Sequence, residues 1–300
     1  MRIVGIIVAR NGSTRVPGKS MIRFMDQPMI WHIIQIAKKI GGLSEICLAT
    51  SDLPKDDQLA ELALQEGITV SRGDAEKVLD RVYAAAEKTK ADAIVYIGGD
   101  CPFLDPAIVS DAVKVFIEEK CDYLNNYEPP TFPGGMDINV VSFSALHKAY
   151  LHALAPSQRV HAFSYLTFHS AEFIIKNYAI SADYGDDLST YHWSLDYPED
   201  VNFIQLVMQK LKEACLEATI QNVLSLIAND SEVKAIHTKL IKSHVFHAFF
   251  SSPGIMKDIN ADIVFLSEKA IDAVLGNRFS EAENYYREIA SIASKLSVIS

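Results

Sequence analysis

The segment that decides the fold is residues 3–9 (IVGIIVA), which run directly into residues 10–19 (RNGSTRVPGK). The first part is apolar and rich in β-branched residues without polar alternation, which predicts a strand buried on both faces of a sheet. The second part places two glycines and three basic side chains just after the carboxyl end of that strand. Because ligands of open α/β sheets bind at such ends, the segment predicts both a fold class and a ligand site.

The rest of the first 237 residues alternates short apolar runs with amphipathic stretches, which is typical of β–α units around a mainly parallel sheet. We expect helices from Pro28 to the stop at Gly41 and at residues 57–66, 106–119 and 198–216. We expect strands at residues 46–50, 93–97, 122–126, 138–143, 173–180 and 191–195. The pattern predicts a doubly wound α/β domain with a mainly parallel sheet over residues 1–237.

Residues 238–300 differ in character, and we assign them to a C-terminal α-helical extension of unknown role. Residues 261–275 have helical periodicity that stops at Gly276. Ser280 and Glu283 match the capping box S-x-x-E, which predicts a second helix from Ser280 toward Leu296. We expect this amphipathic helix pair to pack on the first domain or on a second copy of the chain.

Composition excludes several classes of protein. The 28 basic and 38 acidic side chains give a net charge of −10, which argues against a nucleic-acid partner held by bulk electrostatics. The four cysteines form no C-x-x-C pair, so neither a disulfide framework nor a zinc knuckle is indicated. No window approaches the roughly 18 uninterrupted apolar residues of a spanning helix, and the apolar N-terminal run is too short for a signal peptide. We therefore expect a soluble cytoplasmic protein without a membrane partner.

The first 25 residues depart from this acidic balance, because they carry five basic side chains and no carboxylate. Arg10, Arg15 and Lys19 lie within ten residues and can offset much of the charge of a triphosphate. Gly12 and Gly18 let the backbone turn its N–H groups toward an anion. The spacing differs from a Walker A loop by one residue, and the fingerprint G-x-G-x-x-G is absent. The loop predicts a phosphate site, and the alternative is a basic surface loop.

Residues 9–19, read as A-R-x-G-S-x-R-x-P-G-K, resemble the signature of the cytidylyltransferases that activate sugar acids, the 3-deoxy-manno-octulosonate and acylneuraminate enzymes. The likeness is greatest to the spore-coat polysaccharide biosynthesis branch of that family. The resemblance implies a fold of the nucleotide-diphospho-sugar transferase type, CTP as a substrate, and catalytic roles for Arg10, Arg15 and Lys19. It also implies that the nucleotide is bound by Ala9, Arg10, Asn11, Gly12, Ser13, Arg15 and Lys19.

Two aspartates are candidate metal ligands. Asp100, in residues 98–106 (GGDCPFLDP), and Asp196, in residues 195–200 (LDYPED), each follow a predicted strand and resemble the family's GDCP and DYPED elements. Mg²⁺ prefers one or two carboxylates together with phosphate oxygens and water, so this pair is sufficient. We expect both aspartates to be catalytic and to hold Mg²⁺, with Asp100 also near the nucleotide. The alternative is that each forms a turn before the nearby proline.

Residues 71–81 (SRGDAEKVLDR) resemble the family's R-G-x-x-x-x-V-L-x-R segment. The resemblance implies that Arg72 and Gly73 lie near the base or ribose and that Arg81 lies near the phosphates. An exposed Asp80–Arg81 pair on a helix is the alternative, and such a pair would add little to stability.

The acceptor side departs from the family pattern. Residues 132–138 (FPGGMDI) resemble F-P-D-G-L-D-V, in which Asp137 matches but Gly134 replaces an acidic residue. Residues 157–160 (SQRV) stand where relatives often carry Arg-Glu-His-Val. The resemblance implies acceptor-binding roles for Asp137 and Arg159, and it leaves the identity of the acceptor open.

The predicted reaction is nucleotidyl transfer, in which CMP passes from CTP to a sugar acid or a related sugar and pyrophosphate is released. Relatives are often dimers, so we expect a homodimer. A metal-dependent glycosyltransferase is the first alternative, although the D-x-D motif typical of such enzymes is absent. A catalytically silent nucleotide-binding module is the second.

Overall fold

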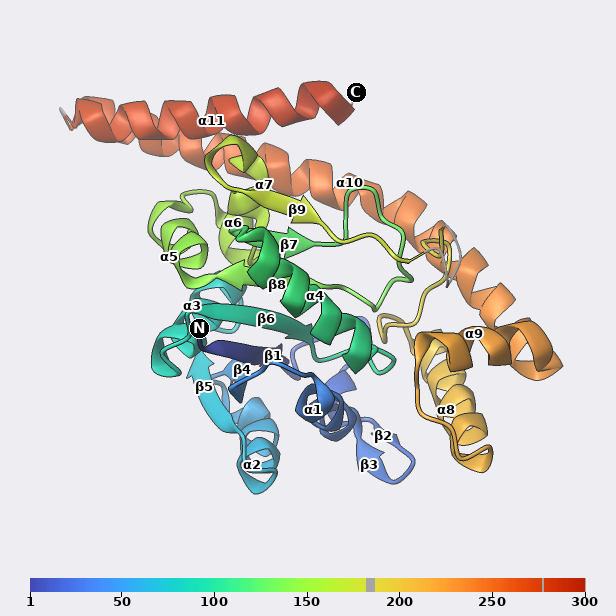
Figure 1. Cartoon of the computed structure of the whole chain (residues 1–300). Helices are drawn as coiled ribbons and strands as arrows, with labels where there is room; N and C mark the ends of the chain where they lie inside the picture. Colours follow the sequence, from blue (N-terminus) through green and yellow to red (C-terminus); the bar gives the residue numbers. More distant parts are fainter. Residues whose placement is uncertain (182–186, 277, 300) are drawn as a thin grey trace.

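The computed structural model describes residues 1–181, 187–276 and 278–299, with side chains described except at 242–261, 275 and 293–299. Its centre is a seven-stranded sheet in the order β5-β4-β1-β6-β8-β7-β9, in which β8 alone runs antiparallel to the other strands (Figure 1). The strands are β1 (Ile3–Val8), β4 (Glu45–Ser51), β5 (Thr69–Gly73), β6 (Ala93–Gly98), β7 (Tyr123–Asn125), β8 (Asn139–Ser142) and β9 (Ile175–Asn177). A two-stranded hairpin, β2 (Arg23–Phe24) and β3 (Gln27–Pro28), stands apart from the sheet.

Helices cover both faces of the sheet, which confirms the predicted doubly wound α/β fold. Ile3 and Ile7 of β1 join a core that includes α1 (Met29–Lys39), α2 (Asp57–Gln65), α4 (Pro106–Glu119), α8 (Pro198–Glu213) and α9 (Ile220–Asn229). Val4 and Ile6 join the opposite core, with α3 (Val78–Lys88), α5 (Phe143–His152) and α7 (Ser164–Phe168). Strand β1 is therefore buried on both faces, as its unbroken apolar pattern predicted.

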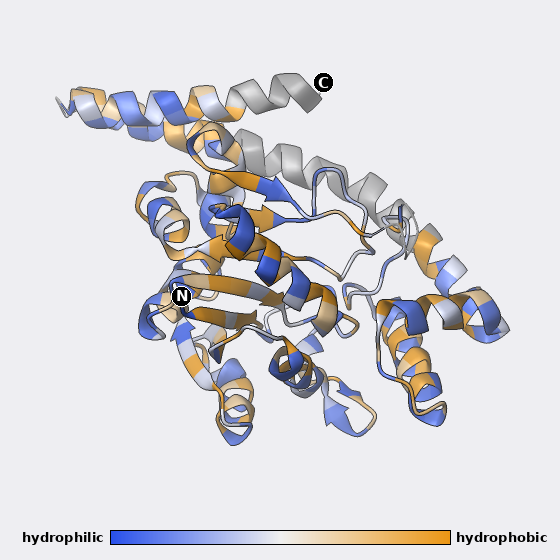
Figure 2. Ribbon diagram, viewed as in Figure 1, coloured by the Kyte–Doolittle hydropathy of each residue, from blue (hydrophilic) through white to orange (hydrophobic). Residues whose placement is uncertain are grey.

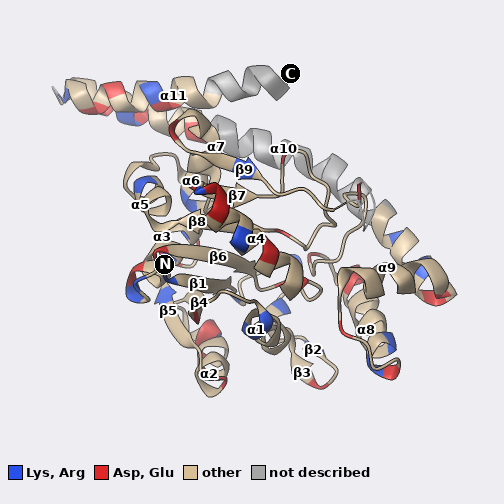
Figure 3. Ribbon diagram, viewed as in Figure 1, with Lys and Arg blue, Asp and Glu red and all other residues tan. Residues whose placement is uncertain are grey.

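Charge and hydropathy follow the same layering. The central strands are mostly hydrophobic, whereas hydrophilic residues lie on the outer helices (Figure 2). Strands β1 and β6 contain no charged residue, and the Lys, Arg, Asp and Glu residues are concentrated on the surrounding helices and loops (Figure 3). Within the described residues, no helix combines the length and the apolar composition needed to cross a bilayer.

The strand predicted at residues 191–195 is wrong. The segment forms a single bridge, between His192 and Gly134, instead of a ladder with the sheet. Tyr191 and Trp193 exchange backbone hydrogen bonds with Gly134, and the Leu195 N–H donates to the Asp100 carbonyl at 2.9 Å. Strand β5, at the edge of the sheet opposite to β9, was not predicted. The other predicted strands are present, although β7, β8 and β9 are shorter than expected.

The C-terminal extension consists of α10 (Ser231–Leu275) and α11 (Phe279–Ile299), which pack against each other. The predicted boundary after residue 237 lies inside α10, and the division into two domains stays a prediction. The predicted Ser280 cap is wrong, because α11 begins one residue earlier and includes Ser280 in its first turn. Figure 1 shows α10 reaching from α9 to the region of α7.

Polar contacts tie the extension to a short helix, α6 (Pro156–Val160). The carboxylate of Asp262 accepts hydrogen bonds from the N–H and the hydroxyl of Ser157. Glu288 accepts from the Gln158 amide and lies 3.0 Å from His169 Nε2. Both carboxylates are almost fully buried, so the helix pair packs on α6 and α7 of the same chain.

Candidate active site

The loop after β1 is held by contacts with the connection between β4 and α2. The Asn11 N–H donates to the fully buried Asp56 carboxylate at 2.6 Å, and the Asn11 amide donates to the Lys55 carbonyl at 3.0 Å. Farther along, the Ser13 hydroxyl accepts from the Val16 N–H at 3.2 Å. Gly18 adopts a left-handed conformation, with a φ of 67°, that favours glycine. The loop is thus held by its own turn and by Asp56.

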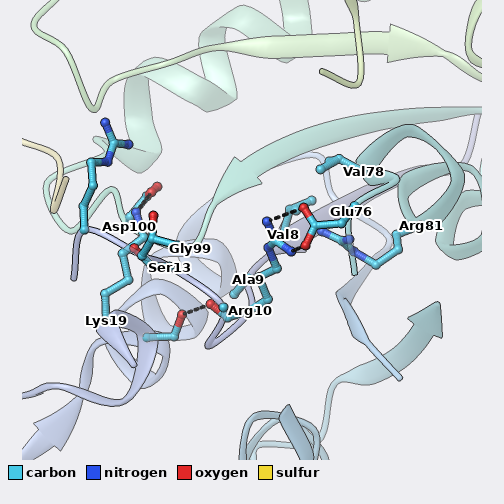
Figure 4. Close-up of a pocket in the computed structure, with 14 residues that line it drawn as sticks. Val8, Ala9, Arg10, Ser13, Lys19, Glu76, Val78, Arg81, Gly99 and Asp100 are labelled. Atoms are coloured by element: carbon cyan, nitrogen blue, oxygen red, sulfur yellow. Dashed lines mark hydrogen bonds and ion pairs between the residues drawn. The ribbon is translucent and has the colours of Figure 1, made fainter. Parts of the chain in front are cut away.

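This loop forms one wall of a pocket of about 400 Å³ at the carboxyl ends of β1 and β6 (Figure 4). Eight of the predicted site residues line it: Ala9, Arg10, Gly12, Ser13, Arg15, Lys19, Arg81 and Asp100. Glu76, Val78 and Gly99 complete much of the remaining wall. Only glycine fits at position 99, because a Cβ there would lie 2.6 Å from Ala9 Cβ and 2.9 Å from the Val8 carbonyl oxygen.

Each of the three loop cations faces a carboxylate. Arg10 makes a two-pronged contact with Glu76 across the pocket, and this hydrogen bond raises the pKa of Arg10 despite partial burial (Figure 4). Arg15 lies 3.5 Å from Asp196, and its guanidinium carbon is 4.9 Å from the centre of the Tyr197 ring. An incoming polyanion can therefore replace carboxylates as the partner of these cations.

Lys19 brings the two predicted metal ligands together. Its Nζ lies 2.5 Å from Asp100 Oδ2 and 3.7 Å from Asp196 Oδ1, and it donates to the Leu195 carbonyl at 3.0 Å. The Lys19 side chain is 16% exposed, and the two carboxylates are about a quarter exposed. Two carboxylates separated by almost a hundred residues thus point at one cation.

Asp196 reaches this position without a strand beneath it. Its N–H and that of Tyr197 donate to Asp200, which is 1% exposed, each at 2.8 Å. Its carboxylate accepts from the Ser194 hydroxyl at 2.5 Å and lies 3.3 Å from His192 Nε2. Burial acts to raise the pKa of Asp196. The hydrogen bonds with His192 and Ser194 and the charge of Lys19 outweigh it and hold the pKa well below its usual value.

Asp137 is a third carboxylate on this side of the site. Its side chain is solvent-accessible, yet protein atoms surround it closely enough for desolvation to be the main cause of its raised pKa. The negative charges of Asp100 and Asp196 add to that effect, and the pKa rises to about 6. Asp137 therefore shares the electrostatic environment of the two predicted metal ligands.

Arg81 is buried, which excludes the alternative of an exposed Asp80–Arg81 pair. It is 2% exposed and donates at 2.6 Å to the carbonyls of Asp74 and Ala75. Its Nε has no hydrogen-bond partner within the described part of the chain. Burial and the positive charge of Arg10 lower its pKa, so two guanidinium groups lie near each other at the pocket wall.

Six predicted residues lie outside the pocket lining: Asp137 and Asp196, described above, and Asn11, Arg72, Gly73 and Arg159. Asn11 braces the loop from behind, as described above. Arg72 donates to the carbonyls of Ser51 and Leu53 and pairs with Asp57 at 2.7 Å, and Gly73 ends β5 beside the Arg81 side chain. Arg159 pairs with Asp80 at 2.7 Å and does not join Asp137. At these positions, Arg72 stabilises the segment after β4 and Arg159 contacts α3.

The sequence analysis did not identify several residues that take part in the contacts of the candidate site. Glu76 lies inside the segment quoted for its resemblance, and only the fold shows that it pairs with Arg10. His192, Ser194 and Asp196 alternate along an extended segment, which places three side chains on one face. This alternation could have been recognised in the sequence. No sequence pattern pointed to Asp56, because its contact with Asn11 depends on how two strand connections meet.

The site fits a divalent cation only in combination with a ligand. Among the residues that the structure describes, no group of three or more His, Cys, Asp or Glu side chains could hold a metal ion by itself. Asp100 and Asp196 converge on one positive charge, and phosphate oxygens and water can complete an octahedral shell. The donor set is therefore suited to Mg²⁺ bound together with a nucleotide.

A basic pocket at the carboxyl ends of parallel strands, with two carboxylates at its edge, defines the chain as a nucleotide-binding α/β protein. A family model described as cytidylyltransferase matches residues 4–180, and the chain belongs to that family. It is a nucleotidyltransferase enzyme.

Individual relatives agree with this assignment. The chain is 28% identical over 216 residues to the spore coat polysaccharide biosynthesis protein SpsF of Bacillus subtilis, which covers 70% of this chain and 88% of that protein. It is 34% identical over 121 residues to the 3-deoxy-manno-octulosonate cytidylyltransferase of Geobacter metallireducens, of which it spans less than half (46%). The solved structure of a cytidylyltransferase from Leptospira borgpetersenii superposes with a TM-score of 0.72 at 26% identity, covering 78% of this chain and 96% of that one.

Proposed function

We propose that the protein transfers CMP from CTP to a sugar acid or a closely related sugar and releases pyrophosphate, in the synthesis of a surface glycan. The observation that carries the proposal is the convergence of Asp100 and Asp196 on the Lys19 ammonium at the edge of the basic pocket. The family match and the names of the SpsF and 3-deoxy-manno-octulosonate relatives support CTP and a sugar acid as the substrates.

In the proposed reaction, the side chains of Arg10, Arg15 and Lys19 and the backbone of Gly12 and Ser13 bind the triphosphate. A sugar hydroxyl attacks the α-phosphorus. A new P–O bond forms while the bond to the bridging oxygen breaks, and pyrophosphate leaves with that electron pair. Burial and the charges of Asp100 and Asp196 raise the pKa of Asp137 to about 6, which suits this carboxylate to accept the hydroxyl proton. Positioning and electrostatic stabilisation carry such a reaction without a covalent intermediate.

Asp100 and Asp196 would hold Mg²⁺ on the phosphates, and the ion would supply positive charge against the negative charge that develops in the transition state. The chain's own contribution is to aim both carboxylates at one point and to keep Asp196 ionised by hydrogen bonding. We further propose a homodimer in the cytoplasm.

A pyrophosphate-release screen tests this function. The full chain is incubated with Mg²⁺ and each of four nucleoside triphosphates, crossed with a panel of sugar acids and sugar phosphates. We expect release with CTP and a sugar acid and not with CTP alone. Release of a nucleoside diphosphate from a nucleotide-sugar would instead indicate a glycosyltransferase, and CTP binding without turnover across the panel would indicate a silent module.

A further inference from the structure

Residues 191–196, which carry Asp196, pack on two glycines of the loop formed by residues 132–138. The Gly134 N–H donates to the Tyr191 carbonyl at 2.9 Å, and the Trp193 N–H donates to the Gly134 carbonyl at 2.8 Å. Gly135 has a φ of 92°, and a Cβ there would lie 2.6 Å from the Ser194 nitrogen. The two backbones therefore touch, and the loop sets where residues 191–196 lie.

The imidazole of His192 fills the space that a side chain at position 134 would need. A Cβ built on Gly134 would lie 2.8 Å from His192 Nδ1 and 3.5 Å from Cε1 of the same ring, and contacts below 3.0 Å require a shift. Gly134 is also the position at which the sequence departs from the acidic residue of the family pattern. Its lack of a side chain is what admits the ring.

The other ring nitrogen of His192 faces the candidate metal ligand. His192 Nε2 lies 3.3 Å from Asp196 Oδ2 and 2.9 Å from the Ser194 hydroxyl, which itself donates to that carboxylate oxygen. The ring therefore contacts Gly134 through Nδ1 and the Asp196 carboxylate through Nε2. A displacement of the ring by a side chain at position 134 moves the group that orients Asp196.

We propose that His192 is a positioning residue of the nucleotidyl transfer, which sets the orientation of Asp196, and that a side chain at position 134 would displace the imidazole from this place. The inference rests on the proposed function, since it concerns the carboxylate assigned to the divalent cation. Groups that hydrogen-bond a metal-ligating carboxylate commonly change metal affinity by about 10- to 100-fold when removed.

A double-mutant cycle on the full chain tests this coupling. The variants are His192→Ala, Gly134→Ala and the combination of both. The probe is Mn²⁺, titrated in the presence of CTP and followed by the electron paramagnetic resonance signal of the free ion. Urea unfolding of each variant is measured in parallel. The exposed His152→Ala is the matched control for His192, and Gly41→Ala, where a Cβ meets only ordinary contacts, is the control for Gly134.

We expect each single variant to weaken Mn²⁺ binding by about tenfold or more. The combination should be no weaker than His192→Ala alone, because removal of the ring leaves room for the new methyl group and the two changes act through one contact. His192→Gln, which keeps a donor near the position of Nε2, should stay within about threefold of the wild type. The urea midpoint of His192→Ala should stay close to that of the wild type, since a merely structural role would lower it.

Effects that multiply in the combined variant, or unchanged Mn²⁺ binding in His192→Ala, would overturn the proposal. A wild-type chain that binds neither CTP nor Mn²⁺ and releases no pyrophosphate would instead refute the proposed function. The two failures are therefore distinguishable.

Discussion

Asp100→Asn separates catalysis from stability more sharply than any other substitution at the site. The change keeps the shape of the side chain and removes one of three neighbouring negative charges. The Asp100 carboxylate is partly exposed and Lys19 keeps Asp196 as a partner, so we expect the loss of the Asp100–Lys19 ion pair to cost only about 1 kcal/mol. Lys19 keeps its hydrogen bond to the Leu195 carbonyl at 3.0 Å and its contact with Asp196.

Relief of repulsion offsets part of that cost. Desolvation is the main cause of the raised pKa of Asp137, and the charge of Asp100 is the next. The neutral amide removes that second effect, so the free energy of unfolding at pH 7 should change by no more than about 1 kcal/mol. Linear extrapolation from urea titrations measures it.

Turnover should respond far more strongly. Removal of one group that stabilises developing charge typically costs about 10²-fold or more, which corresponds to about 2.7 kcal/mol in the activation free energy. A continuous pyrophosphate assay with CTP, Mg²⁺ and the acceptor found in the screen measures the rate. A variant that unfolds like the wild type and turns over within threefold of it would remove Asp100 from the catalytic site.

Three further predictions concern other contacts. Glu76→Gln should lower KM for the nucleoside triphosphate several-fold, because Arg10 no longer has to leave a carboxylate, and an increase in KM would show that Glu76 helps to bind the ligand. Gly99→Ala should lower the free energy of unfolding by about 1–3 kcal/mol, because its Cβ would overlap the first residue of the phosphate loop, and an unchanged urea midpoint would contradict that geometry. Burial acts to lower the pKa of His169, but its hydrogen bond with Glu288 outweighs burial and raises it. The wild type should therefore exceed His169→Asn in unfolding free energy by the full amount below about pH 6.5, and the difference should decrease as the pH rises through the folded-state pKa of His169. A difference that grows with pH would contradict the contact.

The convergence of the basic loop and Asp100 on one pocket could be predicted from the sequence because its signals are local. The apolar run of β1, the glycines and cations that follow it, and Asp100 after β6 all lie within or directly after strands that have unambiguous patterns. Parallel strands bring their carboxyl ends together, so short motifs that are far apart in the sequence meet at one edge.

The acceptor side could not be predicted in the same way. Residues 191–195 have the apolar and aromatic pattern of a strand, but the structure holds them on the Gly134 loop, so burial and not a ladder explains their composition. Arg159 was assigned by resemblance. Its ion pair with Asp80 depends on the placement of α6, which is in turn fixed by Asp262, more than a hundred residues farther along. Contacts between residues so far apart in the sequence produce no periodic pattern in it.

The two cation-facing carboxylates differ in how they are supported. One follows a central strand at the tight approach of Gly99 to the phosphate loop, and the other is suspended from a loop by a few backbone bonds and polar neighbours. Substitutions in residues 131–138 can therefore shift residues 191–196, and Asp196 with them, while Asp100 and the loop after β1 keep their places. For the proposed reaction, this division means that the choice of sugar can change through a loop while the strand-supported carboxylate and the basic loop are retained.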